Sequence, residues 1–203
     1  MDECLRPYLA HISLTQHIPI DVVTILEAYN YHKIAQHVGK VAAEISHLAA
    51  VFDASPDLAL AGWLHDVSAI IPNADRATLC QYFGLEVLPE ERQVPMLLHQ
   101  KLSAVMAEQV WGMTDKSILS AIACHTTLKR DATQADKIVF LADKIRWDQG
   151  GTPPYLDGLL AALEVGLDTA VSFFLQTMWQ RKEEFKVVHP YFIEAYQDVV
   201  REA

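Results

Sequence analysis

Residues 59–66 read Ala-Leu-Ala-Gly-Trp-Leu-His-Asp, an apolar helical run that ends on the adjacent pair His65 and Asp66. Burying an imidazole beside a carboxylate costs free energy unless something such as a metal cation compensates the pair. Adjacent residues point about 100° apart on a helix, so both side chains reach one cation only where the helix ends or where the ion lies over its edge, and Pro72 permits such an end. The neighbours of His65 one turn away are small and would leave space over the imidazole: Ala61, Gly62, Ser68 and Ala69.

Apolar residues recur at helical spacing on both sides of this pair, and the alternating β-branched pattern of strands is almost absent. We therefore predict an all-α fold. The clearest interruption is Gly-Gly-Thr-Pro-Pro at 150–154, which precedes two C-terminal helices. The predicted helices are 21–28, 31–52, 57–67, a short helix after Pro72 that ends near Gly84, 89–97, 99–110, 114–124, 134–148, 155–185 with an interruption near Gly166, and 190–202.

The bulk composition predicts one domain of 203 residues, since 51% of the residues are hydrophobic and can form a sizeable core. The net charge of −10 argues against a nucleic-acid duplex as partner. No run of some 18 apolar residues occurs and the N-terminus is acidic, so we expect a soluble, unprocessed protein with no membrane partner. The three scattered cysteines indicate neither disulfides nor a zinc ribbon, which fits a reducing cytoplasm.

Asp143 is unusual because it lies in a largely apolar helical stretch, Ile-Val-Phe-Leu-Ala-Asp-Lys-Ile at 138–145. A buried carboxylate needs a partner. That partner is either a metal ion or a neighbouring cation, Arg146 or Lys144, and the local sequence favours neither.

His125 follows an apolar helix and opens the polar run Thr126, Thr127, Leu128, Lys129, Arg130. A histidine at this position could simply cap free carbonyls of the helix end. Followed by hydroxyls and two cations, it also resembles the mouth of a phosphate site.

The other histidines and the large aromatic residues are individually typical of core or surface positions. His37 and His99, taken one at a time, are more typical of structural residues than of metal ligands. Trp147 lies one turn from Asp143, so a ligand bound near Asp143 could contact it, although a core role is the simpler interpretation. The histidines interpreted as structural are His11, His17, His32, His47 and His189.

The order of the histidines and aspartates along the chain, and the residues that flank them, favour a metal-binding role over a structural one. The series His37, His65-Asp66, His99, His125 and Asp143 resembles the HD-domain metal-dependent phosphohydrolases. Flanking phrases sharpen the match to the YqeK family, the symmetrical diadenosine tetraphosphatases, over about residues 30–150. These phrases are His-Val-Gly-Lys-Val-Ala-Ala-Glu-Ile-Ser-His-Leu-Ala at 37–49, Ala-Gly-Trp-Leu-His-Asp at 61–66, Leu-Leu-His at 97–99, Ala-Ile-Ala-Cys-His-Thr-Thr at 121–127 and Leu-Ala-Asp-Lys-Ile at 141–145.

The resemblance implies an HD-domain helical bundle with a core at about 30–150 and C-terminal helices 155–202 packed on it. It implies one or two divalent transition-metal ions, iron first with manganese or zinc as alternatives, and cleavage of diadenosine tetraphosphate into two ADP. The implied ligands are His37, His65, Asp66 and Asp143, with His99 and His125 holding a second metal or contacting phosphate. Asp66 and His65 would be catalytic. Lys129 and Arg130 are candidates to hold the polyphosphate, with Thr126 and Thr127 as secondary contacts.

Three departures from the family pattern leave the substrate open. Ala69 stands where the family commonly has a lysine, Leu128 replaces a glycine, and Arg-Trp-Asp-Gln-Gly-Gly at 146–151 replaces the usual Glu-Pro and arginine. Two alternatives therefore remain: an HD-type phosphohydrolase for another nucleotide or phosphoester, and a non-catalytic module that binds a nucleotide and metal. The expected partner is a small-molecule nucleotide, and a homodimer is compatible with the sequence.

Overall fold

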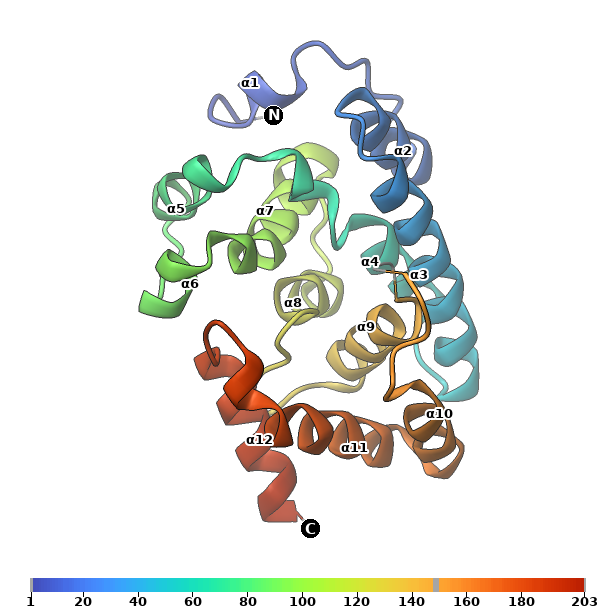
Figure 1. Cartoon of the computed structure of the whole chain (residues 1–203). Coiled ribbons are helices and arrows are strands. Elements are labelled where there is room, and N and C mark those ends of the chain that lie inside the picture. The colour runs from blue at the N-terminus through green and yellow to red at the C-terminus, as the bar shows by residue number, and fades with distance from the viewer. Residues whose placement is uncertain (1, 148–149, 203) are drawn as a thin grey trace.

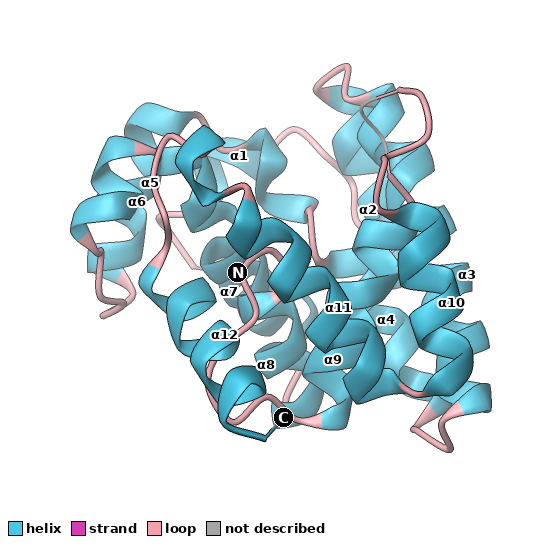
Figure 2. Ribbon diagram, turned by 60° about the horizontal axis from the view of Figure 1, so that its bottom comes forward, coloured by secondary structure: helices cyan, strands magenta, loops and turns pink. Residues whose placement is uncertain are grey.

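The structure, a computed structural model, describes residues 2–147 and 150–202. Over these residues it contains helices and loops and no strand, which confirms the predicted all-α class (Figures 1 and 2). Among the described helices, none has both the length and the apolar character needed to cross a bilayer. The α-helices are α1 Arg6–Leu9, α2 Ile18–Ala28, α3 His32–Val51, α4 Ala59–Leu64, α5 Asn73–Tyr82, α6 Pro89–Gln93, α7 His99–Trp111, α8 Lys116–Cys124, α9 Gln134–Ile145, α10 Leu156–Val165, α11 Leu167–Gln180 and α12 Pro190–Glu202; the 3₁₀ turns are η1 Pro56–Leu58, η2 Val67–Ile70, η3 Pro95–Leu98 and η4 Lys182–Glu184.

Most helix positions agree with the sequence predictions, and the differences have local causes. The segment predicted as a helix over 89–97 divides into α6 and η3 at Val94, because Pro95 restricts the preceding residue to extended backbone, and Val94 has φ −129° and ψ 76°. The interruption near Gly166 is confirmed, since it separates α10 from α11. The helix predicted over 134–148 ends at Ile145, and Asp148 lies outside the described residues. The short α1 was not predicted, because four residues carry too little periodicity.

The segment around 57–67 differs from a single helix in a way that matters for the site. It consists of η1, then α4, then η2, and α4 ends with His65 as its C-cap residue. Asp66 has φ −110° and ψ 8°, outside the helical region. The continuous helix predicted over 57–67 is therefore interrupted at the pair, which places both side chains at a helix end.

The short helix α4 lies inside the molecule, where it contacts α2, α3, α8 and α9. Near the centre of Figure 1, α8 packs against α4, α7 and α9. The close contact between α4 and α3 depends on Gly62, because a Cβ atom built there would lie 2.5 Å from Ala42 Cα. This arrangement fixes the end of α4 in the middle of the helices that supply the other site residues.

The C-terminal helices pack against α9 through aromatic side chains. The rings of Phe140 on α9 and Phe174 on α11 are 5.3 Å apart, and Tyr155 lies 5.0 Å from Phe174. Trp179 stacks on Tyr196 of α12 at 4.2 Å. These contacts agree with the expected packing of residues 155–202 on the rest, and the assignment of the chain to one domain stays a prediction.

A buried polar network joins α6, α7 and the start of α12. Lys101 Nζ lies 2.7 Å from Glu91 Oε1, and His189 Nε2 lies 3.2 Å from the same oxygen. The amide of Tyr191 donates to His189 Nδ1 at 3.1 Å, so the imidazole donates from Nε2 to Glu91. His189 therefore has the structural role that the sequence suggested.

We expect Glu91→Gln to lower the free energy of unfolding by about 3 kcal/mol at pH 7, because it leaves the Lys101 ammonium buried without its counter-charge. Burial alone would raise the pKa of Glu91, but the hydrogen bonds from His189 and Lys101 outweigh it and hold that pKa below its usual value. A lowered pKa means that the stabilisation is complete above the unfolded-state pKa of about 4.3 and is lost as the pH falls through the folded-state pKa.

The difference between the variant and the parent should therefore shrink in acid. Urea unfolding at pH 7 and at pH 4 measures it. The matched control is Glu183→Gln, because Glu183 is 90% exposed and should change stability by less than about 0.5 kcal/mol. A difference that grows in acid would contradict the assignment of the ion pair.

Candidate metal centre

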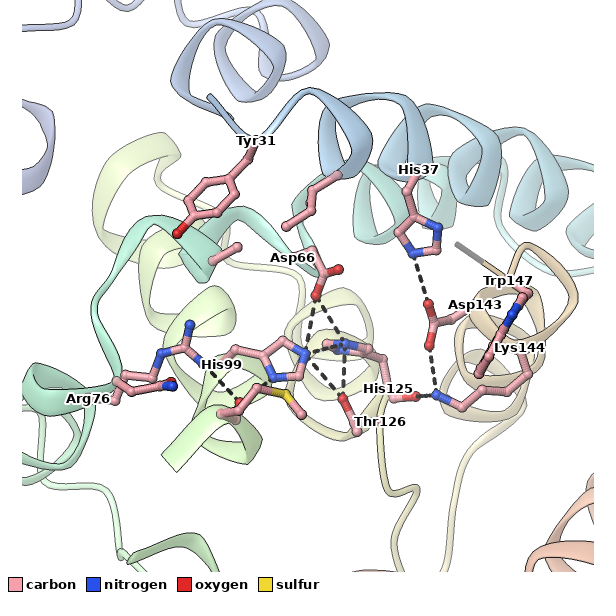
Figure 3. Close-up of a pocket in the computed structure, with 14 residues that line it drawn as sticks. Tyr31, His37, Asp66, Arg76, His99, His125, Thr126, Asp143, Lys144 and Trp147 are labelled. Atoms are coloured by element: carbon pink, nitrogen blue, oxygen red, sulfur yellow. Dashed lines mark hydrogen bonds and ion pairs between the residues drawn. The ribbon is translucent and has the colours of Figure 1, made fainter. Parts of the chain in front are cut away.

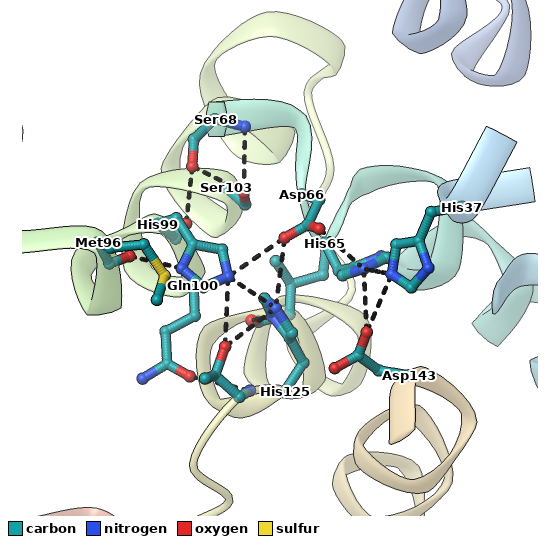
Figure 4. Close-up of polar contacts among 12 residues, drawn as sticks. His37, His65, Asp66, Ser68, Met96, His99, Gln100, Ser103, His125 and Asp143 are labelled. Atoms are coloured by element: carbon teal, nitrogen blue, oxygen red, sulfur yellow. Dashed lines mark hydrogen bonds and ion pairs between the residues drawn. The ribbon is translucent and has the colours of Figure 1, made fainter. Parts of the chain in front are cut away.

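Six side chains from five segments meet at one place in the fold (Figure 4). They come from the second turn of α3, the end of α4, the start of α7, the residue after α8 and the last turn of α9. Every histidine and aspartate that the sequence singled out as a candidate ligand is among them: His37, His65, Asp66, His99, His125 and Asp143.

All the imidazoles of this cluster are oriented by the same kind of hydrogen bond, in which Nδ1 faces a main-chain carbonyl oxygen. A carbonyl only accepts, so Nδ1 must carry the proton and donate it. Three of the histidines are C-cap residues of a helix or turn and bond to the carbonyl three residues before them. The pairs are His65 with Gly62 at 2.8 Å, His99 with Met96 at 2.6 Å, His125 with Ile122 at 2.8 Å, and His37 with Arg146 at 3.0 Å.

With Nδ1 bonded to a carbonyl, Nε2 is the atom that each imidazole presents to the centre, and it offers a lone pair to a metal ion when the imidazole is neutral. His65 Nε2 lies 3.3 Å from His37 Nε2, and His99 Nε2 lies 3.0 Å from His125 Nε2. His37 Nε2 is also 3.0 Å from Asp143 Oδ1. Nitrogen and carboxylate oxygen atoms this close repel one another unless a proton or a metal cation lies among them, and this is the usual orientation of histidines that bind metal. The donor set therefore fits a divalent transition metal.

Asp66 lies between the two pairs of histidines. Its Oδ2 is 3.5 Å from His65 Nε2, and its Oδ1 is 3.2 Å from His99 Nε2 and 3.6 Å from His125 Nε2. Burial alone would raise the pKa of Asp66, but the surrounding imidazoles outweigh it and hold that pKa well below its usual value. The carboxylate stays ionised and can face ligands on both sides.

Asp143 contacts Lys144, one of the two cations that the sequence offered as its partner, and it also faces two of the candidate metal ligands. Lys144 Nζ lies 2.6 Å from its Oδ2, while Oδ1 faces His37 and lies 3.6 Å from His65 Nε2. Burial alone would raise the pKa of Asp143, but the Lys144 charge, followed by the bond with His37, holds it well below its usual value. Arg146 instead pairs with Glu44.

His125 is buried, and burial lowers its pKa to about 4. Its imidazole is therefore neutral at pH 7, which is the state that can bind a metal ion. The carbonyl-capping role that the sequence suggested and a ligand role are both compatible with the geometry, because capping uses Nδ1 and leaves Nε2 for the centre.

A cavity of about 420 Å³ opens on the cluster (Figure 3). Besides His37, Asp66, His99, His125 and Asp143, its wall includes cations and aromatic residues that the sequence analysis did not assign to the site or assigned mainly to the core. Arg76 is only 6% exposed, and it donates from Nε to Ile71 O and from Nη1 to Met96 O. The further lining residues are Lys144, Tyr31 and Trp147.

The predicted phosphate contacts are only partly brought to this cavity. Thr126 lines it, with Oγ1 at 3.2 Å from His99 Nε2 and 3.1 Å from His125 Nε2. Thr127 is turned away and donates to Leu128 O.

The expectation that Lys129 and Arg130 point toward the substrate is corrected by their positions. Lys129 Nζ pairs with Asp136 at 3.1 Å and contacts Ser120, and Arg130 faces Asp198 of α12. Neither residue lines the cavity at the cluster, where Arg76 and Lys144 supply the cations instead.

The expectation that four small residues leave space over His65 is also largely corrected. Gly62 is packed against α3, and Ala61 is fully buried in the core. Ser68 is buried and donates to His99 O at 2.8 Å. Of the four, Ala69 lines the cavity.

Comparison with known proteins agrees with this geometry. The model of the HD domain matches residues 34–148. The chain is 45% identical over 140 residues to an uncharacterised protein in the pepC 5′ region of Lactococcus lactis subsp. cremoris. The aligned residues make up 69% of this chain and 71% of that protein. It is 29% identical over 126 residues to a symmetrical bis(5′-nucleosyl)-tetraphosphatase of Staphylococcus aureus, covering 61% of this chain and 62% of that one.

The fold is also that of a solved structure. A crystal structure of a predicted HD superfamily hydrolase involved in NAD metabolism from Clostridium acetobutylicum superposes with a TM-score of 0.82 at 24% identity, over 90% of this chain and 96% of that one. The resemblance seen in the order of histidines and aspartates is thereby confirmed, and the chain belongs to the HD domain family.

Proposed function

We propose that this HD-domain hydrolase cleaves a phosphoanhydride bond in a nucleotide, and that its preferred reaction is the symmetrical cleavage of diadenosine tetraphosphate into two ADP. One observation carries the proposal: four imidazoles held with Nε2 inward meet two ionised carboxylates at the wall of a cavity that also holds two cations. Support for the substrate comes from the likeness to the tetraphosphatase of S. aureus.

The proposed metal ligands form two groups that share His65. One consists of His37, His65 and Asp143, the other of His65, Asp66 and His125, and in each group the ligand atoms lie within 4.8 Å of one another. His99 Nε2 lies beside the second group. We therefore propose one or two ions, and the mixture of imidazole and carboxylate suits iron, manganese or zinc. When bound, such an ion lowers the pKa of water and neutralises charge on phosphoryl oxygens.

The remaining steps belong to residues of the chain. The ionised Asp66 accepts a hydrogen bond from the attacking water and orients it toward the phosphorus. Arg76 and Lys144 attract the negatively charged polyphosphate, and Thr126 offers a hydroxyl beside His99 and His125. Trp147 supplies an aromatic face for a base. The −10 net charge of the chain makes these local cations the main source of attraction.

The test is a panel of dinucleoside polyphosphates and mononucleotides, assayed with iron, manganese and zinc. Diadenosine tetraphosphate should give ADP alone, while ATP plus AMP would contradict symmetrical cleavage. Metal analysis of protein purified without chelator should find one or two transition-metal ions per chain. A protein that neither contains nor binds these ions would overturn the proposal.

A second candidate keeps the chemistry and changes the substrate to another nucleotide or phosphoester. Ala69 favours it, because this residue lines the cavity with a methyl group where the resemblance led us to expect a lysine. Faster turnover of another member of the panel would establish this alternative. If no member turned over while nucleotide and metal still bound, the chain would be a non-catalytic binding module.

We expect Arg76→Lys to raise the KM for diadenosine tetraphosphate about tenfold, because lysine cannot reproduce the planar fork that holds two carbonyls and faces phosphate. Steady-state kinetics measure this, and melting temperatures check the fold. The matched control is Arg92→Lys, an exposed position of α6 that should leave KM unchanged. An unchanged KM in Arg76→Lys would remove Arg76 from the binding site.

A further inference from the structure

A second cavity, of about 270 Å³, adjoins the cavity at the metal centre. Thr126 and Lys144 line both of them, so one wall is shared. In Figure 3 these two residues lie on the side of the site away from Tyr31. The second cavity continues from them toward α11 and the segment 185–192.

The wall of the second cavity is mainly apolar and aromatic. Phe174 on α11 and Phe192 on α12 are nearly buried, and Phe185 is 38% exposed at the edge. Leu97, Met178 and Val187 complete the apolar part.

The polar groups of this wall are already used within the protein. Both ring nitrogens of His189 are engaged, with Glu91 and with the amide of Tyr191. Thr127 donates its hydroxyl to Leu128 O. The wall thus favours a flat, weakly polar group over one that needs directed hydrogen bonds.

We propose that this cavity binds the second nucleobase of a dinucleoside polyphosphate, an inference that rests on the proposed function. A symmetrical substrate has one base on each side of the bond that breaks, so an enzyme that cleaves it in the middle needs a base site on each side of the metal centre. Tyr31 lines the first cavity on the side away from Thr126 and Lys144, and Trp147 lies beside Lys144 (Figure 3). On the second side the polyphosphate passes Thr126 and Lys144, a hydroxyl and a cation that suit phosphate, before the aromatic wall begins.

The apolar and aromatic wall of the second cavity determines which nucleobases it accepts. Stacking and burial accept any base, because every base has an apolar face. Mixed dinucleotides such as adenosine-guanosine tetraphosphate should therefore be cleaved with a KM within about threefold of that for diadenosine tetraphosphate.

Two substrates with the same four phosphates test the proposal: diadenosine tetraphosphate with two bases, and adenosine 5′-tetraphosphate with one. In Phe185→Ala the KM for the two-base substrate should rise about tenfold, while the KM for the one-base substrate should change less than twofold. Val187→Trp, which fills the cavity from a half-buried loop position, should produce the same selective rise. Tyr82→Ala removes an exposed aromatic ring on α5 and is the matched control.

Calorimetric titration with a dinucleotide whose central bridge is a non-hydrolysable methylene should show the same tenfold weakening. If both variants keep the parent's KM for the two-base substrate and its affinity for the methylene analogue, the base site is wrong and the proposed function stands. If the parent cleaves neither tetraphosphate and does not bind the analogue, the proposed function fails and the base site fails with it.

Discussion

Asp66→Asn is expected to reduce hydrolysis by on the order of 10³-fold and to lower the metal content of the purified protein. Among the described residues, Asp66 is the carboxylate whose two oxygens face both pairs of histidines, with His65 on one side and His99 and His125 on the other. Asparagine keeps the size of the side chain but removes the negative charge and turns one ligand oxygen into an amide nitrogen.

The measurements are the turnover number with diadenosine tetraphosphate and the metal content by plasma emission spectroscopy. The matched control is Asp168→Asn, because Asp168 is 77% exposed and pairs with Lys137 far from the cavity at the cluster. Its turnover and metal content should equal those of the parent. An Asp66→Asn protein with parental metal content and turnover within threefold would show that Asp66 is not part of the catalytic centre.

The cluster could be predicted from sequence because its members carry local signals at helix ends. His65, His99 and His125 each follow a helix or 3₁₀ turn, and each bonds to the carbonyl three residues earlier. The sequence indicated the end at His125 from the polar run that follows, whereas it predicted a helix through Val67 and showed only that Pro72 permits an end near His65. It could not show that one local geometry aims three Nε2 atoms at a common point, since that depends on how the helices pack.

The cations of the site could not be predicted in the same way. Lys129 and Arg130 closely follow His125 in the sequence, but Lys129 pairs with Asp136 and Arg130 with Asp198. Asp198 also accepts a hydrogen bond from the amide of Asp131, which lies in the same loop as Arg130 and 67 residues before Asp198. Arg76 stands in α5, a helix with no ligand-type motif, and reaches the cavity because Ile71 and Met96 carbonyls hold its guanidinium. The direction of a long charged side chain depends on its partners in the folded structure, so its distance in sequence from a ligand does not predict whether it lines the site.

The small residues around His65 show the same limit. Each of them stands three or four residues from His65 in the sequence, but each faces a different environment: Ala61 faces the core, Gly62 faces α3, Ser68 bonds to His99 O, and Ala69 faces the cavity. A periodic pattern gives the angle around one helix. It does not say which neighbour occupies that angle.

Gly62→Ala is expected to lower the free energy of unfolding by about 2 kcal/mol and to weaken metal binding. The new Cβ atom would lie 2.5 Å from Ala42 Cα and 2.7 Å from Ala42 N, so the backbone of α3 or α4 must move. Alanine gains about 1 kcal/mol of helix propensity over glycine. Overpacking against backbone costs about 3 kcal/mol or more, so the unfavourable effect dominates.

The functional effect follows from the hydrogen bond that orients His65, because the acceptor of its Nδ1 proton is the carbonyl of Gly62 itself. A shift of α4 moves this carbonyl, and loss of such an orienting partner weakens metal affinity about 10- to 100-fold. Urea unfolding and metal titration measure the two effects. The control is Gly39→Ala, where the new Cβ meets the far edge of the Trp63 ring at 3.1 Å and the change in stability should stay below about 1 kcal/mol, because a side chain can yield where backbone cannot. If Gly62→Ala left both unfolding and metal affinity unchanged, the tight contact between α3 and α4 would not be what positions His65.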